Sequence, residues 1–537
     1  MKIPVLPNSI LKYIIETLIN GYNVKNHTHC TIKQLDRIFY QFSMACQRWM
    51  DDIIPTVEFN IPFRITSQTL FRKFEIWVGL GIKFSDVIFT TNILSQESDV
   101  SLVLRSKVHV RSAISTMNFA NGYVFLGNTS YSPFEFIRKI QIDDTLSMSL
   151  PVLLGNLFPC TEHLTTIHIN LNRFIKAQEH EDIIGSLNQL CNKFIYIDDI
   201  SIRGSLKSNE KITEHLYKFP NIIQKLKSLH LIYEFITVHQ DLNNILTHPF
   251  SCVQSLKLHK TKNSKMHDPI PIYQSLLNCF ETHHTLTVLS LHFADFIIDT
   301  QHIQQILKNQ KLKSLKLKFK QLTNNNNIQL YNNNNSITVL TLNFAEANLS
   351  DCNAIVDAIE NLNSFKLALR LPVNSLNLVE FNPKRQFYME LVIPYQPESF
   401  DIYLDSKYSF HKLVNNLTVK LLNINDTVAL IEHLYHLSKM IRLDTLYLNM
   451  LYHTSLLKPL HNNTNIKNLI LVRPNPQRDH ITGSKVIDDL LVHSKNLLTI
   501  YLTSPTHPRI DQPSLAFFKQ NTNLQRIYSK SYFSIYK

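Results

Sequence analysis

Glycine is scarce in this sequence, with 9 residues among 537. Phosphate-binding turns of nucleotide-dependent enzymes depend on glycine, because a side chain would keep the backbone N–H groups away from the phosphate. The sequence also contains no Walker loop, no G-x-S-x-G elbow and no protein-kinase signature. We therefore expect a protein that is not an enzyme and that uses no cofactor.

Long apolar runs are also missing, since no stretch of 18 or more uncharged apolar residues occurs. Charged and polar residues interrupt the first twenty positions, MKIPVLPNSILKYIIETLIN, so we expect neither a signal peptide nor a membrane span. The seven cysteines are odd in number, widely spaced and free of C-x-x-C pairs. This pattern favours reduced structural thiols in the cytoplasm or the nucleus, and a protein that is not secreted.

Metal-ligand patterns are weak despite 24 histidines. His27, His29 and Cys30 lie together, and His283 is followed by His284, but no second pair stands at zinc-finger spacing and no H-E-x-x-H frame is present. We expect no metal site. The net charge, 54 − 42 = +12, comes without a dense Lys/Arg run. It favours acidic partners, and we do not expect nucleic acid to be one of them.

A repeated L-x-x-L-x-L pattern is the strongest positive signal. Strict matches begin at Leu226, Leu286, Leu312 and Leu443. When any large apolar residue is accepted in place of leucine, the pattern extends into a ladder of similar segments, which we call rungs. Their mean spacing is about 28 residues. The first positions of its rungs are Ile54, Phe84, Ile114, Ile137, Leu164, Ile197, Leu226, Val253, Leu286, Leu312, Ile337, Ser364, Tyr388, Val414, Leu443, Ile466, Leu497 and Leu524.

This spacing predicts a short strand in each rung, because residues two apart in a strand point to the same side of a sheet. Between rungs the apolar period changes to that of a helix. Helices are expected in the segments DTQHIQQILKNQ, NLSDCNAIVDAIENL, NDTVALIEHLYHLSKM and TGSKVIDDLLVHS. The asparagine runs Asn324–Asn327 and Asn332–Asn335 are expected to form a surface loop between two rungs.

These coils resemble leucine-rich repeats with helical backs. The likeness is clearest in NIKNLILVRPNPQRDHITGSKVIDDLLVHSKNLLTIYL, and it implies an α/β solenoid, a horseshoe of strand–helix coils over residues 54–537. We expect an irregularity near residues 364–414, where the rungs are weaker. The family usually places Asn or Cys three residues after the last strand leucine, whereas this chain has Ala294, Lys320, Ala345 and Leu451 there.

Residues 1–53 have a different pattern and predict a small helical segment. It begins with Leu-Pro, continues with apolar residues at helical spacing and ends in a second helical stretch with a Cys-x-x-Trp pattern. In this it resembles an F-box, the segment that docks on the Skp-type adaptor of a cullin–RING ubiquitin ligase, although Asn8 replaces the usual acidic residue. The residues that would bind the adaptor by this likeness are Leu6, Pro7, Ile10, Ile14, Leu18, Cys46 and Trp49. The alternative is a plain helical cap over the first coil.

A basic strip is predicted between the inward-pointing strand residues of the middle coils. It contains no carboxylate and comprises Lys227, His230, Lys257, His259, Lys313, Lys316 and Lys318. Such a strip favours an acidic or phosphorylated protein partner. The alternative is that these lysines only solubilise the strands and blunt the sheet edges.

Two functional readings follow. In the first, the chain is a protein-binding adaptor, the substrate-recognition subunit of an SCF-like ubiquitin ligase, with the N-terminal segment on the ligase and the repeats on the substrate. In the second, it is a leucine-rich-repeat scaffold without a ligase link, and residues 1–53 only cap the solenoid. A third reading, a regulatory fragment of a signalling protein, lacks the nucleotide-binding module that would accompany the repeats.

Overall fold

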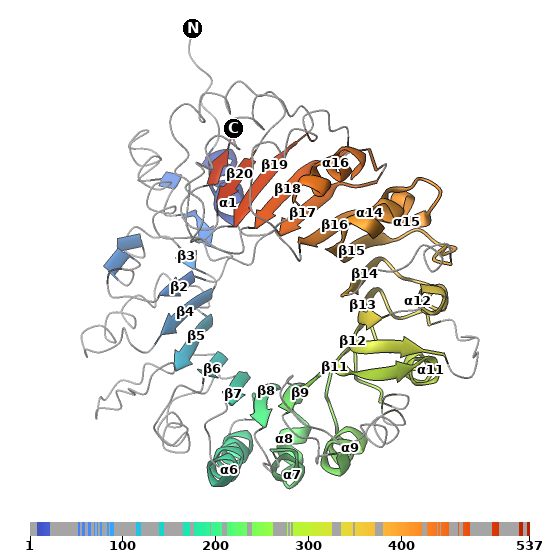
Figure 1. Ribbon diagram of the computed structural model, residues 1–537. Helices are drawn as coiled ribbons and strands as arrows, with labels where there is room; N and C mark the ends of the chain where they lie inside the picture. Colours follow the sequence, from blue (N-terminus) through green and yellow to red (C-terminus); the bar gives the residue numbers. More distant parts are fainter. Residues whose placement is uncertain are drawn as a thin grey trace. The chain divides into compact units, whose positions relative to one another are not determined.

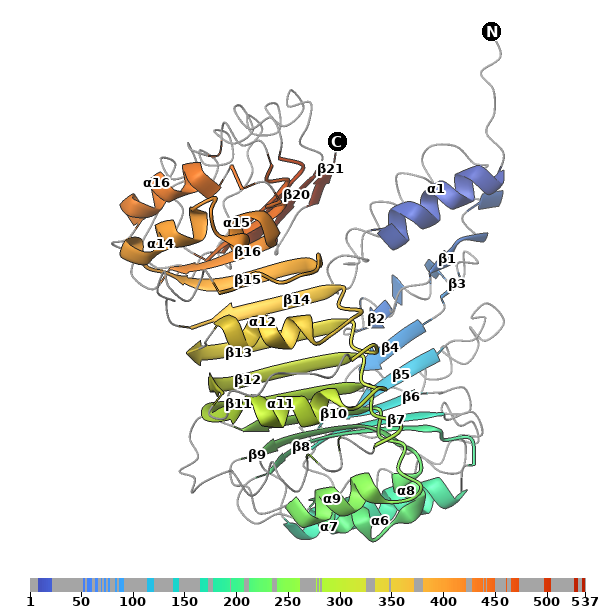
Figure 2. The ribbon, with the colours of Figure 1, turned by 90° about the vertical axis from the view of Figure 1, so that its right-hand side faces the viewer.

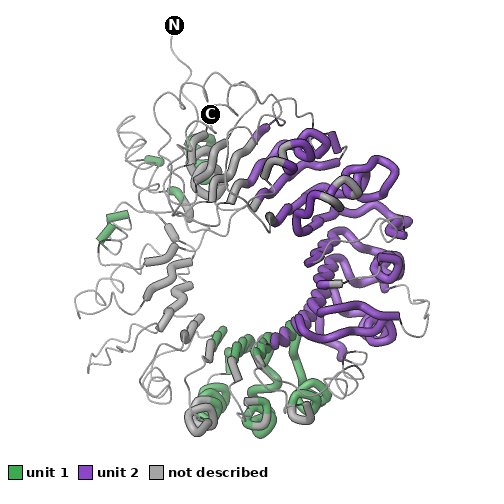
Figure 3. Tube along the Cα trace, in the orientation of Figure 1, with its two compact units in different colours: residues 1–256 green, residues 257–537 purple. Residues whose placement is uncertain are grey.

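The computed structural model describes part of the chain, and the structural statements below refer to that part. It covers residues 8–21, 52–53, 56–59, 63–65, 69, 72–73, 76–77, 83–84, 86–90, 114–119, 139–143, 165–171, 177–193, 195–206, 212–233, 239–260, 277, 280, 283–324, 334–346, 349–370, 380–421, 427–437, 439–440, 442–449, 460, 465–472, 497–503, 526–529 and 534–536. The chain divides into two compact units, Met1–Leu256 and Lys257–Lys537 (Figure 3).

Unit 1 contains a parallel sheet whose strands pair in chain order, although one short strand between the first two pairs elsewhere. Its strands are β2 (Phe63–Ile65), β4 (Asp86–Thr90), β5 (Ile114–Phe119), β6 (Lys139–Asp143), β7 (Thr166–Leu171), β8 (Asp199–Leu206) and β9 (Leu226–Tyr233). Its helices are α1 (Asn8–Gly21), α6 (Ala177–Lys193), α7 (Ile212–Tyr217), α8 (Pro220–Ile223) and α9 (His239–Thr247). Helices α6 to α9 lie on one side of β7–β9 (Figure 1).

In unit 2 the strands from β11 to β20 are all parallel, and each pairs with the next along the chain. They are β11 (Val288–Asp299), β12 (Ser314–Thr323), β13 (Val339–Glu346), β14 (Ser364–Leu369), β15 (Tyr388–Tyr395), β16 (Val414–Leu421), β17 (Thr445–Asn449), β18 (Asn468–Val472), β19 (Thr499–Thr503) and β20 (Arg526–Ser529). The last strand, β21 (Ser534–Tyr536), is antiparallel to β20. Strand β10 (Ser255–Lys260) spans the boundary between the units.

The helices of unit 2 lie on one side of its sheet (Figures 1 and 2). They are α11 (Thr300–Leu307), α12 (Leu349–Asp357), α14 (Pro397–Leu404), α15 (Ser409–Leu413) and α16 (Thr427–Leu437). The predicted alternation of strand and helix is present in part, since a described helix follows β11, β13, β15 and β16. A parallel sheet in which each strand pairs with its sequence neighbour, with helices along one side, is a solenoid-like α/β fold.

The apolar ladder forms the core. In the rung that begins at Leu312, this residue and Leu315 and Leu317 have no exposed surface. Residues at the next inward position form a row of phenylalanines, Phe293, Phe319 and Phe344, which pair in register and are at most 2% exposed. The rings of Phe293 and Phe319 lie 5.8 Å apart between centroids. The side-chain period of two therefore determines which residues are buried.

A second row of residues joins consecutive coils just before their strands. We call His283, Asn309 and Asn334 the ladder residues, since each lies three positions before the first residue of a rung. Asn309 Nδ2 donates to the carbonyl oxygens of Phe280 at 2.6 Å and His283 at 3.1 Å. Asn334 Nδ2 donates to those of Leu307 at 2.7 Å and Asn309 at 2.9 Å. The coils are thus tied together by side chains that lie before the strand.

The asparagine runs were predicted to be surface loop, and the structure corrects this for two of their members. Asn334 is 0% exposed. Asn324 accepts from Thr300 Oγ1 at 2.9 Å and donates to Asp351 Oδ1 at 3.1 Å, so it links the first turns of helices α11 and α12. Only Asn335, among the described members of the second run, is exposed.

Three rungs of the ladder, those assigned to Phe84, Ser364 and Tyr388, were each placed two residues away from their position in the structure. Register pairs Leu340 with Phe365 and Phe365 with Met389, so the rungs assigned to Ser364 and Tyr388 begin two residues earlier. Phe89 pairs with Met117, which moves the rung assigned to Phe84 two residues later. A shift of two residues leaves the same apolar residues facing the core, so the pattern alone could not distinguish the registers.

The rung at Ile54 was also misplaced, because its strand is not part of the main sheet. Strand β1 (Glu58–Phe59) pairs only with β3 (Lys83–Phe84) among the described strands. The strand that pairs with β4 is instead β2, which the ladder missed. At three residues, β2 is too short to show an alternating pattern.

Three of the four predicted helices are present in the described residues. Helix α11 begins after Asp299, whose carboxylate accepts from the backbone N–H of Gln301 at 2.8 Å, and Ile303, Ile306 and Leu307 are buried as expected. Helix α16 buries Leu430, Leu434 and Leu437. Helix α12 ends at Asp357, before Leu362, because Leu362 begins the next rung. The segment TGSKVIDDLLVHS lies outside the described residues.

The range 364–414, where we expected an irregularity, keeps its sheet. Strands β14, β15 and β16 pair in parallel, with one register shift between Met389 and Glu390. Buried aromatic rings fill the space behind them: Phe381 and Phe410 stack with centroids 5.0 Å apart, and Tyr395 Oη lies 2.8 Å from His433 Nδ1. The boundary expected between residues 53 and 54 stays a prediction.

Candidate partner-binding face

Strand β12 shows how the outward side of the unit 2 sheet arises from alternation. Leu315, Leu317 and Phe319 point inward and have no exposed surface, whereas Lys316 is exposed and Lys318 is half-buried. Because residues two apart share a side of the sheet, every second residue of β12 is available to a partner. Helices α11 and α12 cover the other side of these strands (Figure 1).

Parallel register places the outward residues of neighbouring strands in rows. The first row runs from Ser290 through Lys316, Thr341 and Lys366 to Glu390. The second row runs from His292 through Lys318 and Asn343 to Ala368. Strands in a sheet lie about 4.8 Å apart, so residues in one row are close enough to contact the same ligand.

The predicted basic strip is divided between the two units. Lys227 and His230 lie half-buried on β9 in unit 1, where Lys227 Nζ is 3.9 Å from Asp198 Oδ2. In unit 2, Lys257 and His259 lie on β10, and Lys316 and Lys318 lie on β12. Lys313 is exposed in the turn before β12, so it is outside the two rows.

Two histidines stack at one end of the second row. The rings of His259 and His292 are 3.9 Å apart between centroids, with 12° between their planes. Burial, together with the smaller effects of His259, Lys318, Arg370 and Lys316, lowers the pKa of the His292 imidazole to about 3. At neutral pH His292 is therefore uncharged and surrounded by cationic groups.

Arg370 belongs to this cluster although it follows β14. Its side chain reaches back along the sheet, and Nε donates to Asn343 Oδ1 at 3.3 Å while Nη2 donates to the Phe319 carbonyl oxygen at 3.3 Å. Nη1 makes a longer contact of 3.5 Å with the carbonyl oxygen of Ala294. The guanidinium group is thus held above three strands. We call Lys257, His259, His292, Lys316, Lys318 and Arg370 the basic face.

Carboxylates lie at the borders of the basic face. Asp295 Oδ2 is 3.8 Å from Nζ of Lys260, whose side chain is 4% exposed and lies 4.0 Å from the centre of the Phe296 ring. Burial lowers the pKa of Lys260, and the charge of Asp295 opposes that shift. On the other side, Lys366 forms an ion pair with Glu390. These two pairs separate the basic face from the rest of the sheet.

Sequence reasoning missed Arg370 and Lys260. Arg370 lies in the rung that was assigned to Ser364, and its contacts with strands 51 and 76 residues earlier leave no local signal. Lys260 follows the alternation of β10 and occupies an inward position, where a lysine is rare because burying its charge is costly. Its partner Asp295 is 35 residues further along the chain, which no spacing rule predicts.

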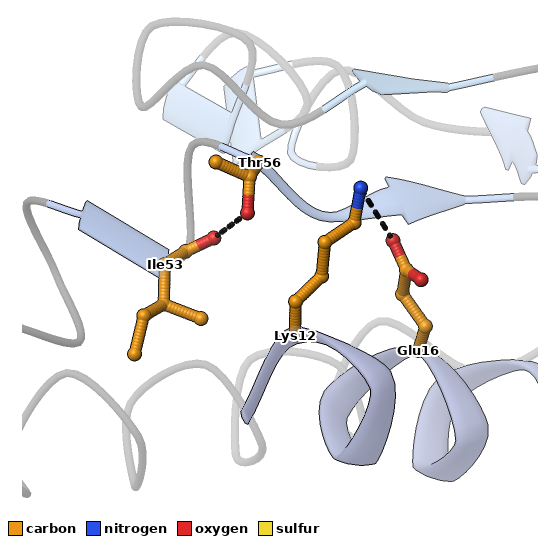
Figure 4. Close-up of polar contacts among 4 residues, drawn as sticks. All are labelled: Lys12, Glu16, Ile53 and Thr56. Carbon is orange, nitrogen blue, oxygen red and sulfur yellow. Dashed lines mark hydrogen bonds and ion pairs between the residues drawn. The ribbon is translucent and has the colours of Figure 1, made fainter. Parts of the chain in front are cut away.

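The N-terminal candidates are only partly described. In α1, Ile10 is 44% exposed and Leu11 is 7% exposed. Lys12 Nζ lies 3.5 Å from Glu16 Oε1, and Thr56 Oγ1 donates to the Ile53 carbonyl oxygen at 2.7 Å (Figure 4). Ile14 and Leu18 belong to α1, but their side chains lie outside the description, as do Leu6, Pro7, Cys46 and Trp49.

The described residues contain no group of three or more His, Cys, Asp or Glu side chains that could hold a metal ion. His283 is buried beside Thr285, whose backbone N–H lies 3.4 Å from His283 Nδ1, and His27, His29 and Cys30 lie outside the description. Cys191, Cys252 and Cys352 are free thiols. Among the described helices, none is long and apolar enough to cross a membrane.

Comparison with known proteins gives little. No model of a protein family matches the chain, and no curated protein matches it. Among solved structures, the chain is similar to one described as the crystal structure of the Rad7 and Elc1 complex in yeast. The similarity has a TM-score of 0.35 and 13% identity, and covers 85% of this chain and 98% of that one. Such a low score carries no functional argument.

Proposed function

We propose that the chain is a protein-binding adaptor without catalytic activity, and that the basic face of unit 2 binds an acidic segment of its partner. The observations that carry this proposal are the register of β11–β14, which gathers cationic side chains on the outward side of the sheet, and the stacking of His259 of β10 on His292 of β11. An extended acidic segment that crosses the strands would meet Lys316 and Lys318 on neighbouring rows. Its charge complementarity would direct association and select partners.

The individual lysines contribute little by themselves, because an exposed ion pair is worth about 0–1 kcal/mol. Their effect on binding comes from their number and from the His292 and Arg370 groups beside them. Salt screens exposed charges over about 10 Å at 0.1 M. Binding through the basic face should therefore weaken steeply as the ionic strength rises.

The test uses the full chain and a fluorescein-labelled glutamate-rich peptide, with binding followed by fluorescence anisotropy. The double substitution Lys257→Glu/Lys316→Glu should weaken binding about tenfold or more, since two attractive contacts become repulsive. Lys420→Glu is the matched control, because Lys420 is exposed on β16, outside the basic face. Equal affinities for all three proteins would mean that the lysines only solubilise the strands.

We propose further that the coils are leucine-rich repeats in a horseshoe arrangement, and that the chain is the substrate-recognition subunit of an SCF-like ubiquitin ligase. The exposure of Ile10 beside the buried Leu11 supports this role, since an F-box-like segment must keep apolar residues available for a Skp-type adaptor. In the alternative, a scaffold without a ligase link, α1 only caps the first coil. The packing of α1 against β1 fits either role.

A pull-down of the full chain with a purified Skp-type adaptor separates the two roles. Ile10→Asp should abolish capture, because it places a charge in the contact. Ile76→Asp is the control, since Ile76 is 60% exposed in the same unit. Absence of capture by the unsubstituted chain, together with loss of solubility when residues 1–53 are deleted, would establish the cap and refute the ligase role.

A further inference from the structure

We propose that the basic face contains a phosphate-binding subsite, in which Arg370, Lys318 and Lys316 hold the phosphoryl group of a phosphorylated serine or threonine on the partner. The inference rests on the function proposed above, because it names the chemical group bound by one part of the same face. Its position is the end of the sheet rows next to the stacked His259 and His292 rings.

The geometry of Arg370 is the first argument. A guanidinium group has five N–H donors, and three of them are used by Asn343, Phe319 and Ala294. The group is therefore held in place, and two donors are not taken up by the described part of the chain. An arginine that is already ordered loses less entropy on binding, and its planar fork matches the oxygens of a phosphate.

The balance of charge is the second argument. Lys316 and Lys318 lie two positions apart on the outward side of β12, and Arg370 Nε donates to Asn343, the register partner of Lys318. Asp295 is the described carboxylate that acts on Arg370, and it also lies 3.8 Å from Lys260 Nζ. Among these described residues, the cations outnumber the carboxylate. A phosphate monoester carries about −1.5 to −2 charges and three acceptor oxygens, and so complements the cluster better than one carboxylate.

His292 supplies the third argument. Its pKa is about 3 because of burial and its cationic neighbours His259, Lys318, Arg370 and Lys316. A bound phosphate would stabilise the imidazolium form, and so raise this pKa toward its ordinary value. Binding should therefore add protons to His292 as the pH falls. His292→Gln should remove this proton uptake, while the protonation of the phosphate itself is the same for both proteins.

The experiment measures the binding of three labelled peptides to the full chain. They are a glycine–serine peptide with one phosphoserine, the same peptide unphosphorylated, and the same peptide with one glutamate at that position. We expect the phosphopeptide to bind at least about tenfold more tightly than the other two. Arg370→Gln and Lys318→Gln should each remove about tenfold of that affinity, and Lys420→Gln should have no effect.

The outcomes separate the subsite from the function on which it rests. Binding of the glutamate-rich peptide that needs Lys257 and Lys316, without a preference for phosphoserine, would overturn the subsite and leave the proposed function standing. No binding of the glutamate-rich peptide would overturn the proposed function itself. If Arg370→Gln lowers the thermal midpoint of the protein, the binding of the phosphopeptide to Lys318→Gln is the test instead. Weaker binding by this variant supports the subsite, and unchanged binding overturns it. Titration calorimetry in buffers of different ionisation enthalpy measures the protons taken up when the phosphopeptide binds. His292→Gln should take up fewer protons on binding than the unsubstituted chain.

Discussion

Asn334 and Asn335 are neighbours in one asparagine run, yet they have opposite environments. Asn334 is fully buried, and its side-chain oxygen accepts from the backbone N–H groups of Ser336 at 2.9 Å and Ile337 at 2.8 Å. Its amide nitrogen donates to two carbonyl oxygens of the preceding coil. One side chain therefore satisfies four backbone groups, which explains why a polar residue is stable at this buried position.

Replacing Asn334 with alanine should destabilise unit 2 by about 2–4 kcal/mol, because each buried backbone group left without a partner costs about 1–3 kcal/mol and water can reach some of them. The measurement is the free energy of unfolding in urea. Asn335→Ala is the matched control, since its side chain is exposed. Equal stability of the two variants would show that the ladder residues do not hold the coils together.

His283 occupies the ladder position that asparagine holds in the next two coils. Its Nδ1 accepts from the backbone N–H of Thr285, as Asn309 Oδ1 accepts from that of Lys311 at 2.8 Å. Burial, with a smaller effect from His284, lowers the pKa of His283 to about 4. The unfolded chain binds this proton near pH 6.5 and the folded chain only near pH 4. The contribution of neutral His283 to the free energy of unfolding is thus complete above pH 6.5 and is lost as the pH falls toward 4.

We therefore expect His283→Asn to reduce the acid sensitivity of the protein. The unsubstituted chain should lose about 2 kcal/mol more than the variant between pH 7 and pH 5, because only its ladder position takes up a proton. Urea unfolding at the two pH values measures this difference. His436→Asn serves as the control, since His436 is exposed on α16. Parallel pH profiles for His283→Asn and the unsubstituted chain would contradict the account.

At the scale of the strands and helices, the sequence predicted what depends on local periodicity. The inward leucines of the rungs from Leu286 to Ile337 lie where the ladder placed them, because alternation fixes the buried side of each strand. The phase of the rungs at Ser364 and Tyr388 could not be fixed, because a shift of two residues preserves alternation. The separate pairing of β1 and β3 depends on contacts that no local pattern reports.

The phenylalanine row leads to a prediction at this scale. Phe319 pairs in register with Phe293 and Phe344 and has no exposed surface. Phe319→Ala should destabilise the protein by about 3–5 kcal/mol, because it leaves a cavity between two neighbouring rings. Lys320→Ala, at the exposed next position, should change the unfolding free energy by less than about 0.5 kcal/mol. Similar losses for both variants in thermal or urea unfolding would contradict this placement of the core.

At the scale of the whole molecule, function depends on how many coils place cations on the same side of the sheet. The sequence predicted Lys257, Lys316 and Lys318 as outward residues, because their positions follow from alternation. It did not reveal that Arg370 completes the cluster, since Arg370 reaches it across three strands. A binding face that several coils build together has no local sequence motif. This explains why the composition indicated a net positive charge but not the position of the face.

Lysine acylation footprinting of the full chain, with and without the glutamate-rich peptide, tests the central claim most directly. Mass spectrometry then reports the reactivity of each lysine. The account predicts that the peptide protects Lys257, Lys316 and Lys318, while Lys420 on β16 keeps its reactivity. Protection spread evenly over all exposed lysines, or strongest at Lys420, would show that the basic face is not where the partner binds.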